Sequence, residues 1–234
     1  MFRSFLTVGL LSIVLMGCSY AQNPKSDSGK EIYRISDYIE GKGYEKYEVA
    51  TLAGGCFWCT EAAFERIKGV VDVISGHSGG DLEYPTYRKV STGTTKHTET
   101  VQIYYDPEVV TFDQLLEVFV VAHDPTQLNR QGNDIGPQYR SEVFYHNDEQ
   151  KEKAKAFFKE LDKSGKFGKK TVTKITPYKE FWTAEAYHQD YYEQDPNKVD
   201  FWYNTGYIMN VTRPKVEKVK KTFQAWLKDE YRGK

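Results

Sequence analysis

Two cysteines three positions apart, Cys56 and Cys59, are the residues whose types and spacing most directly indicate chemistry. An alternating run over 47–53 precedes them and predicts a strand, while apolar residues at helical spacing over 61–67 predict a helix. Two glycines link these elements, so we expect Cys56 at or just before a helix N-terminus. Unpaired N–H groups and the helix dipole favour a thiolate there. The pattern therefore predicts a nucleophile with a second thiol close by.

The same stretch carries a resemblance to a known family. Gly-Cys-Phe-Trp followed by Glu-Ala-Ala-Phe is similar to the active-site motif of peptide methionine sulfoxide reductase A. Because further pieces occur in the family's order between about residues 47 and 192, the match is more specific than an isolated Cys-x-x-Cys. These pieces are 75–80, 85–87, 94–99, 123–136, 138–141 and 186–189.

The resemblance implies a nucleophile and an acid. Reducing a sulfoxide needs a nucleophile on sulfur and a proton on oxygen; Cys56 fits the first role, and attack would leave a sulfenic acid on it and release methionine. Glu99 lies in an alternating strand, where a charged residue usually faces solvent. The resemblance implies instead that Glu99 is the family's acid, buried beside apolar rings that raise its pKa so that it can donate a proton.

Further site residues follow from the resemblance alone. Two tyrosines would hydrogen-bond the sulfoxide oxygen, two aromatics would form the pocket for the substrate methyl group, an aspartate would join the polar network, and a histidine would support the site. In that order they are Tyr87 and Tyr139, Phe57 and Trp58, Asp134, and His188. Without the resemblance, ring packing and an Asx turn explain these residues equally well, since the chain has 18 tyrosines.

The histidines do not indicate a metal site. The chain has 5, and they are scattered without the spacing of a metal motif. We therefore expect neither a metal nor a prosthetic cofactor, only an external thiol reductant. His77 stands where the family more often has tyrosine in a glycine-rich turn.

Recycling of the nucleophile must differ from that of many relatives. These resolve the sulfenic acid with a cysteine in the C-terminal tail, whereas no cysteine follows Cys59 here. One helical turn separates the Cα atoms of Cys56 and Cys59 by about 5 Å, within the range of a disulfide. We expect a Cys56–Cys59 disulfide that a thioredoxin-like partner reduces. Direct reduction of the sulfenic acid by that partner is the alternative.

The N-terminus predicts export. Arg3 precedes an apolar run over 5–16, too short to span a membrane, which is typical of a secretory signal. Leu-Met-Gly-Cys at 15–18 resembles the bacterial lipobox, which would lipidate Cys18 and anchor the protein at a membrane facing the periplasm or the exterior. An ordinary signal-peptidase site over 19–21 is the alternative.

Composition and pattern set the organisation of the chain. Its 234 residues are 39% hydrophobic, and 32 basic residues nearly balance 33 acidic ones, so nothing indicates nucleic-acid binding. We expect a monomer with a signal peptide at 1–17, a polar spacer and N-terminal extension at 18–44, and one catalytic domain at 45–234.

The order of elements predicts an α+β fold with a ferredoxin-like sandwich of split βαβ units. After the first strand and helix, we expect strands at 70–75, 98–105, 141–145 and 171–175, helices starting at 111 and capped by Asp148, a wrapping tail from 181, and a last helix over 214–228.

Two other functions remain open from the residues. A thiol–disulfide oxidoreductase would use the Cys-x-x-Cys pair and predicts a thioredoxin-like fold. A surface lipoprotein that binds a partner through its aromatic tail would explain the export signal but not the cysteine stretch.

Overall fold

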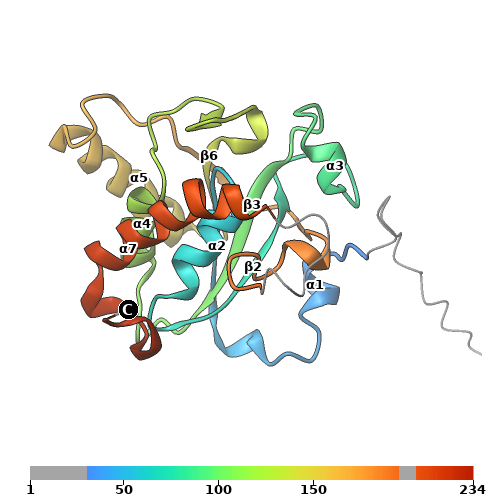
Figure 1. Cartoon of the computed structure of the whole chain (residues 1–234), viewed down its shortest axis with the longest axis horizontal. Coiled ribbons are helices and arrows are strands. Elements are labelled where there is room, and N and C mark those ends of the chain that lie inside the picture. Colours follow the sequence, from blue (N-terminus) through green and yellow to red (C-terminus); the bar gives the residue numbers. More distant parts are fainter. Residues whose placement is uncertain (1–30, 195–203, 234) are drawn as a thin grey trace, which may run out of the picture.

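The computed structural model describes residues 31–194 and 204–233, and its centre is a six-stranded sheet (Figure 1). The strand order is β7-β6-β1-β3-β2-β8. The strands are β1 (Glu48–Gly54), β2 (Val70–Ser78), β3 (Thr98–Tyr105), β6 (Ser141–Tyr145), β7 (Lys174–Pro177) and β8 (Phe181–Thr183).

Four of these strands form two interlocked split βαβ units. Strand β1, helix α2 (Phe57–Glu65) and β2 make one unit, with β3 lying between the two strands. Strand β3, helix α4 (Phe112–Ala122) and β6 make the other, with β1 between them, and every neighbouring pair among the four is antiparallel. This is the ferredoxin-like arrangement that the sequence predicts. It is not the thioredoxin-like fold that the disulfide-exchange alternative requires.

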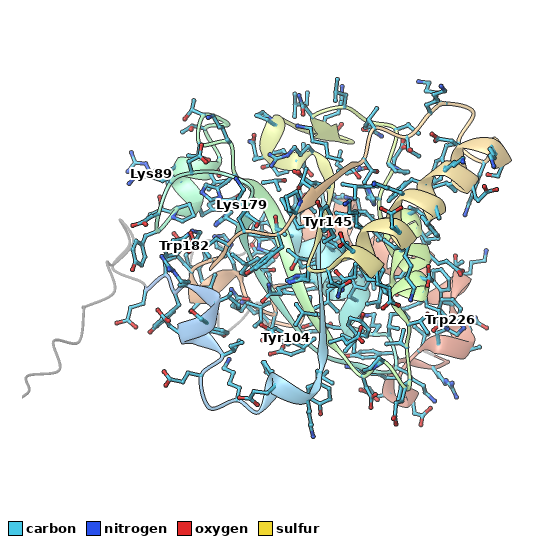
Figure 2. The ribbon with its side chains drawn as sticks, turned by 180° about the vertical axis from the view of Figure 1, so that it is seen from behind. Lys89, Tyr104, Tyr145, Lys179, Trp182 and Trp226 are labelled. Carbon is cyan, nitrogen blue, oxygen red and sulfur yellow. The ribbon has the colours of Figure 1, made fainter. Side chains whose placement is uncertain are left out.

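Both faces of the sheet are covered. Helices α2 and α4 pack on one face, α7 (Arg213–Thr222) packs on both of them, and Figure 1 shows α2 and α7 in front of the strands. The other face, which Figure 2 views from behind with Tyr104 labelled, is covered by the N-terminal segment, whose Tyr44 ring lies 4.6 Å from that of Tyr104. All eight residues of β3 are therefore buried, although their alternation alone would fit a half-exposed strand.

The remaining elements are short or lie at the edges. They are α1 (Ile35–Tyr38), α3 (Tyr87–Val90), α5 (Asp148–Ser164), α6 (Thr205–Tyr207), a π-helix at Ile208–Thr212, and the two-stranded ribbon of β4 (Arg130–Gln131) and β5 (Asp134–Ile135). Short 3-10 turns lie at Tyr44–Lys46, Pro137–Tyr139, Ala186–His188, Gln224–Trp226 and Asp229–Tyr231.

Several element limits differ from the prediction because of partners distant in the sequence. Strand β2 continues past Gly76 because β8 pairs with it, and a Cβ on Gly76 would lie 2.2 Å from the backbone oxygen of Trp182. The cap of α5 is Asn147 rather than Asp148, since the Asn147 side chain accepts the Gln150 N–H at 2.8 Å.

Two element limits in the C-terminal half also differ from the prediction. Strand β7 begins at Lys174 instead of 171, where it meets β6 in parallel. The last helix ends at Thr222, and only a short 3-10 turn follows before the 228 limit expected from the apolar spacing.

The expected signal peptide, the lipobox with Cys18 and most of the polar spacer lie outside the described residues. Across 31–194 and 204–233, no helix has both the length and the apolar character that a membrane span requires.

Candidate active site

The local geometry at Cys56 comes from one glycine. Strand β1 ends at Gly54, and Gly55 turns the chain with φ of +90° so that Cys56 becomes the N-cap residue of α2. A Cβ on Gly55 would lie 2.6 Å from the Cβ of Gln131. Only glycine satisfies both the backbone angle and the close approach. The structure thus puts Cys56 at the helix start, where the sequence predicts it.

The electrostatics of Cys56 differ from the expectation. We predicted that the helix N-terminus would lower the pKa of its thiol, but burial, with Cys56 only 4% exposed, raises that pKa well above the usual range. The neighbouring sulfur of Cys59, which accepts the Cys56 hydrogen bond and carries negative charge, and the charge of Glu99 add to the increase. The Phe57 N–H of the first helical turn is also taken, since it donates to Glu99 Oε2 at 3.0 Å. In the resting protein Cys56 is therefore a thiol.

Glu99 is buried and close to the nucleophile. It lies at the start of β3, 2% exposed, and reaches the helix N-terminus through the Phe57 bond. Burial raises the pKa of its carboxyl to about 8, and the charges of Asp134 and Cys59 act in the same direction. Near neutral pH the carboxyl is protonated and able to donate.

Cys59 lies in the opposite electrostatic environment. Its sulfur accepts a hydrogen bond from the Cys56 thiol, which is the largest cause lowering its pKa to about 6. The Lys215 ammonium, with Nζ 3.6 Å from Sγ, and Thr212, with Oγ1 3.5 Å from Sγ, add to this effect. The reduced pair therefore carries its negative charge on Cys59, not on Cys56.

Aromatic rings surround the thiols. The Trp58 ring stacks on Tyr191 at 3.7 Å, and its Nε1–H donates to His188 Nδ1 at 3.1 Å. The His188 ring also lies 5.2 Å from that of Phe57. The tryptophan hydrogen bond makes Nδ1 the acceptor, which fixes the tautomer of His188 and the orientation of Trp58.

The two tyrosines of the resemblance lie near the thiol and the buried carboxyl. The Tyr87 ring lies 6.1 Å from that of Phe57. Burial and then the charge of Glu99 raise the pKa of both Tyr87 and Tyr139, and Cys56 contributes to each. Both phenols therefore keep their protons, and both are close enough to Glu99 and Cys56 to feel their charges.

The polar network includes a residue that the sequence analysis missed. Tyr207 donates its hydroxyl proton to Asp134 Oδ2 at 2.7 Å and lies within hydrogen-bond reach of Cys56. Its ring meets Trp58 edge-on, with centroids 5.6 Å apart. The structure thus places Asp134 beside the thiols through a tyrosine from the C-terminal segment.

A π-helix explains how this segment reaches both thiols. Tyr207 precedes it and Thr212 ends it, and the Arg213 N–H bonds to the Ile208 carbonyl five residues back. Residues five apart face the same way under this bonding, whereas in an α-helix they diverge by about 140°. Tyr207 and Thr212 can therefore serve Cys56 and Cys59 together.

His77 also lies beside the candidate active site. It pairs across the sheet with Glu99, is fully buried, and its ring lies 5.7 Å from that of Phe57. Neither ring nitrogen has a hydrogen-bond partner among the described residues, and burial lowers the pKa of His77 to about 3. This histidine is therefore neutral and acts in packing.

No sequence signal identifies Tyr207, Thr212 or Lys215, because each lies more than 100 residues from the cysteines in a segment without a motif. Within the described parts of the chain, no three side chains of the types that bind metals gather into a site.

Comparisons with known proteins agree with this geometry. The family described as peptide methionine sulfoxide reductase matches residues 48–225. The chain is 51% identical over 189 residues to peptide methionine sulfoxide reductase MsrA 1 of Rhodopirellula baltica, covering 80% of this chain and 93% of that protein. It is 46% identical over 181 residues to MsrA of Thermus thermophilus, covering 77% and 98%.

Solved structures give the same result. Methionine sulfoxide reductase A of Corynebacterium diphtheriae aligns with a TM-score of 0.64 and 33% identity, covering 79% of this chain and 87% of that one. Reduced Mxr1 of Saccharomyces cerevisiae aligns with a TM-score of 0.60 and 36% identity, covering 68% and 91%. With its thiol pair, buried carboxyl and ferredoxin-like sheet, the chain belongs to the peptide methionine sulfoxide reductase family.

Proposed function

We propose that this protein reduces the S-epimer of methionine sulfoxide, free or in proteins, to methionine. The observation that carries the proposal is Glu99, a buried carboxyl protonated at neutral pH and bonded to the amide that directly follows the nucleophile. Family membership supports it, since the relatives at about half identity are reductases of this kind. The two sulfoxide epimers need separate enzymes, and the family resemblance assigns the S-epimer here.

The first half-reaction transfers oxygen from the substrate to the thiol. Cys56 attacks the sulfoxide, Glu99 gives its proton to the oxygen and regains one from the thiol, and the substrate S–O bond breaks. The oxygen forms a new bond to the Cys56 sulfur as the bond between the two sulfurs breaks and methionine leaves, so that Cys56 becomes a sulfenic acid. Tyr87 and Tyr139 orient the oxygen, while Phe57 and Trp58 contact the methyl group.

The second half-reaction restores the thiol. Cys59 attacks the sulfenic acid, which forms a Cys56–Cys59 disulfide and releases the oxygen as water. A thioredoxin-like dithiol partner then reduces the disulfide. No prosthetic cofactor takes part in this scheme.

Location completes the proposal. The apolar run and lipobox-like residues support export and lipid anchoring at Cys18, with the catalytic body at the membrane surface as a monomer. Labelling cells with a radioactive fatty acid should mark the wild-type chain and not Cys18→Ala.

The activity is tested by turnover of methionine (S)-sulfoxide with dithiothreitol. Cys56→Ser should abolish methionine release. Without dithiothreitol, Cys59→Ser should still release one methionine per protein while accumulating sulfenic acid. Glu142→Gln is a control carboxyl variant outside the site. Absence of turnover in the wild-type chain would refute the proposed function.

A further inference from the structure

The sulfur of Cys59 has contacts from an element that the half-reaction at Cys56 does not use. Lys215 of α7 lies with Nζ 3.6 Å from Cys59 Sγ, and Thr212 lies with Oγ1 at 3.5 Å. Cys59 itself is 1% exposed, so the ammonium is brought to a sulfur largely removed from water. A positive charge at this distance from a buried sulfur stabilises its thiolate strongly.

We propose that Lys215 is a catalytic residue of recycling, which holds Cys59 as a thiolate both when it attacks the Cys56 sulfenic acid and when it leaves during reduction. The inference deepens the proposed function and rests on Cys59 being the resolving thiol. In this chain the C-terminal segment thus supplies a charge rather than a third thiol.

The contacts of Lys215 and Thr212 matter most after Cys56 has been oxidised. In the reduced pair, the Cys56 thiol donates the largest stabilising hydrogen bond to Cys59. Oxidation of Cys56 removes that thiol at the moment when Cys59 must attack. Lys215 and Thr212 come from α7 and the π-helix, so their contacts do not depend on the oxidation state of Cys56.

Both steps balance with Cys59 as a thiolate. In the first, its electron pair forms the bond to Cys56 sulfur, the S–O bond breaks, and the hydroxyl leaves as water after taking up one proton. In the second, a dithiol reductant attacks the Cys56 sulfur, and the S–S bond breaks so that its electron pair returns to Cys59. The Cys56 sulfur is the more accessible of the two at 4% exposure. Leaving is faster for a thiol of lower pKa, so the same ammonium assists both steps.

Other charged or titratable groups face Cys59 as well. Besides Cys56 on its own helix and Lys215, they are Asp134 on β5, Glu99 on β3 and Tyr207 on α6. Asp134 opposes the thiolate, and Glu99 and Tyr207 are protonated near neutral pH, so Lys215 is the cation in this set.

The test separates the two half-reactions in the full-length reduced protein. A single equivalent of methionine (S)-sulfoxide is added without reductant, and three quantities are followed over a range of pH: methionine release, dimedone-reactive sulfenic acid, and the Cys56–Cys59 disulfide by peptide mass spectrometry. The oxidised proteins are then reduced with dithiothreitol. The variants are Lys215→Met, which removes the charge, Lys215→Arg, which keeps it, and Lys218→Met, an exposed lysine of the same helix.

Lys215→Met should still release one methionine per protein, which also shows that it folds. It should form the disulfide about 3- to 30-fold more slowly at neutral pH, because an adjacent cation shifts a pKa by about 1 to 3 and part of the lost thiolate is offset by higher nucleophilicity. The pH midpoint of disulfide formation should rise, and dithiothreitol reduction should slow. Lys215→Arg should restore most of the rate, and Lys218→Met should match the wild type.

Three outcomes would contradict the proposal in distinguishable ways. A wild-type rate and pH profile of disulfide formation in Lys215→Met would show that the ammonium does not act on Cys59. Methionine release with lasting sulfenic acid in the wild type would remove Cys59 as the resolving thiol. No methionine release in the wild type would refute the proposed function itself.

Discussion

Replacing Glu99 with glutamine tests the protonation of the buried acid through stability rather than activity. The carboxyl has a pKa of about 8 in the folded protein against an ordinary value of 4.5. Below pH 4.5 both states are protonated, and the group has no effect on the unfolding free energy. As pH rises, the unfolded chain ionises first, so the folded state loses stability by about 1.4 kcal/mol for each pH unit up to about pH 8.

The size of the stability cost follows from the pH range between the two pKa values of Glu99. At pH 7 the cost of keeping Glu99 neutral is about 3 kcal/mol, and it rises to a constant value of about 5 kcal/mol above pH 8. Glutamine cannot ionise, and its carbonyl can still accept the Phe57 N–H. Glu99→Gln should therefore unfold with a free energy about 3 kcal/mol higher than the wild type at pH 7, and with an equal one near pH 4. It should also lose about 100-fold or more of its methionine release.

Urea unfolding at several pH values provides the measurement, and Glu142→Gln provides the matched control. Glu142 is buried to a similar degree, at 4% exposure, but is paired with Arg140 at 2.5 Å. Its replacement removes the negative charge that faces the buried Arg140 guanidinium and should destabilise the protein by about 3 kcal/mol. A Glu99→Gln protein that is no more stable than the wild type at pH 7 would mean that Glu99 is ionised in the fold, and it would refute its role as proton donor.

Three further predictions concern the same site. Methionine release by the wild type should fall as pH rises through about 8, since Glu99 must be protonated, and single-turnover rates across pH would show no such fall if the acid lay elsewhere. Tyr207→Phe should slow methionine release about tenfold, because the bond to Asp134 and the contact with Cys56 are lost while the ring remains; an unchanged single-turnover rate would remove Tyr207 from the site. Gly55→Ala should lower the unfolding free energy by about 1 to 3 kcal/mol, measured in urea, through its backbone angle and the crowded Cβ; a neutral effect would contradict the turn geometry.

The sequence predicted the part of the site whose structure depends on residues that are neighbours in the chain. The strand, the glycine turn and the helix that place Cys56 are consecutive, so periodicity and turn chemistry define them without tertiary information. The limits of β3 agree with its alternating pattern for the same reason. Family resemblance added Glu99, whose burial its own strand pattern could not reveal, because the elements that cover each face of β3 lie elsewhere in the chain.

The remaining features depend on contacts between distant segments. The helix dipole at Cys56 is local and favours a thiolate, but the burial that opposes it comes from rings and helices far along the sequence. Lys215 lies in a segment whose spacing indicates only a helix, and Tyr207 lies in the expected wrapping tail, which has little regular spacing. Their approach to the thiols is set by how that helix packs on α2, which no pattern within it encodes.

The π-helix before α7 bears on how this site withstands changes in chain length. It is one residue longer than an α-helical turn, so the segment carries the equivalent of a single insertion. If exposed Asn210 were deleted, Tyr207 and Thr212 would be four residues apart, a spacing that an ordinary α-helix also keeps on one side. The winding of the helix thus absorbs the extra residue, and the chain can lose a residue here while both thiols keep their partners.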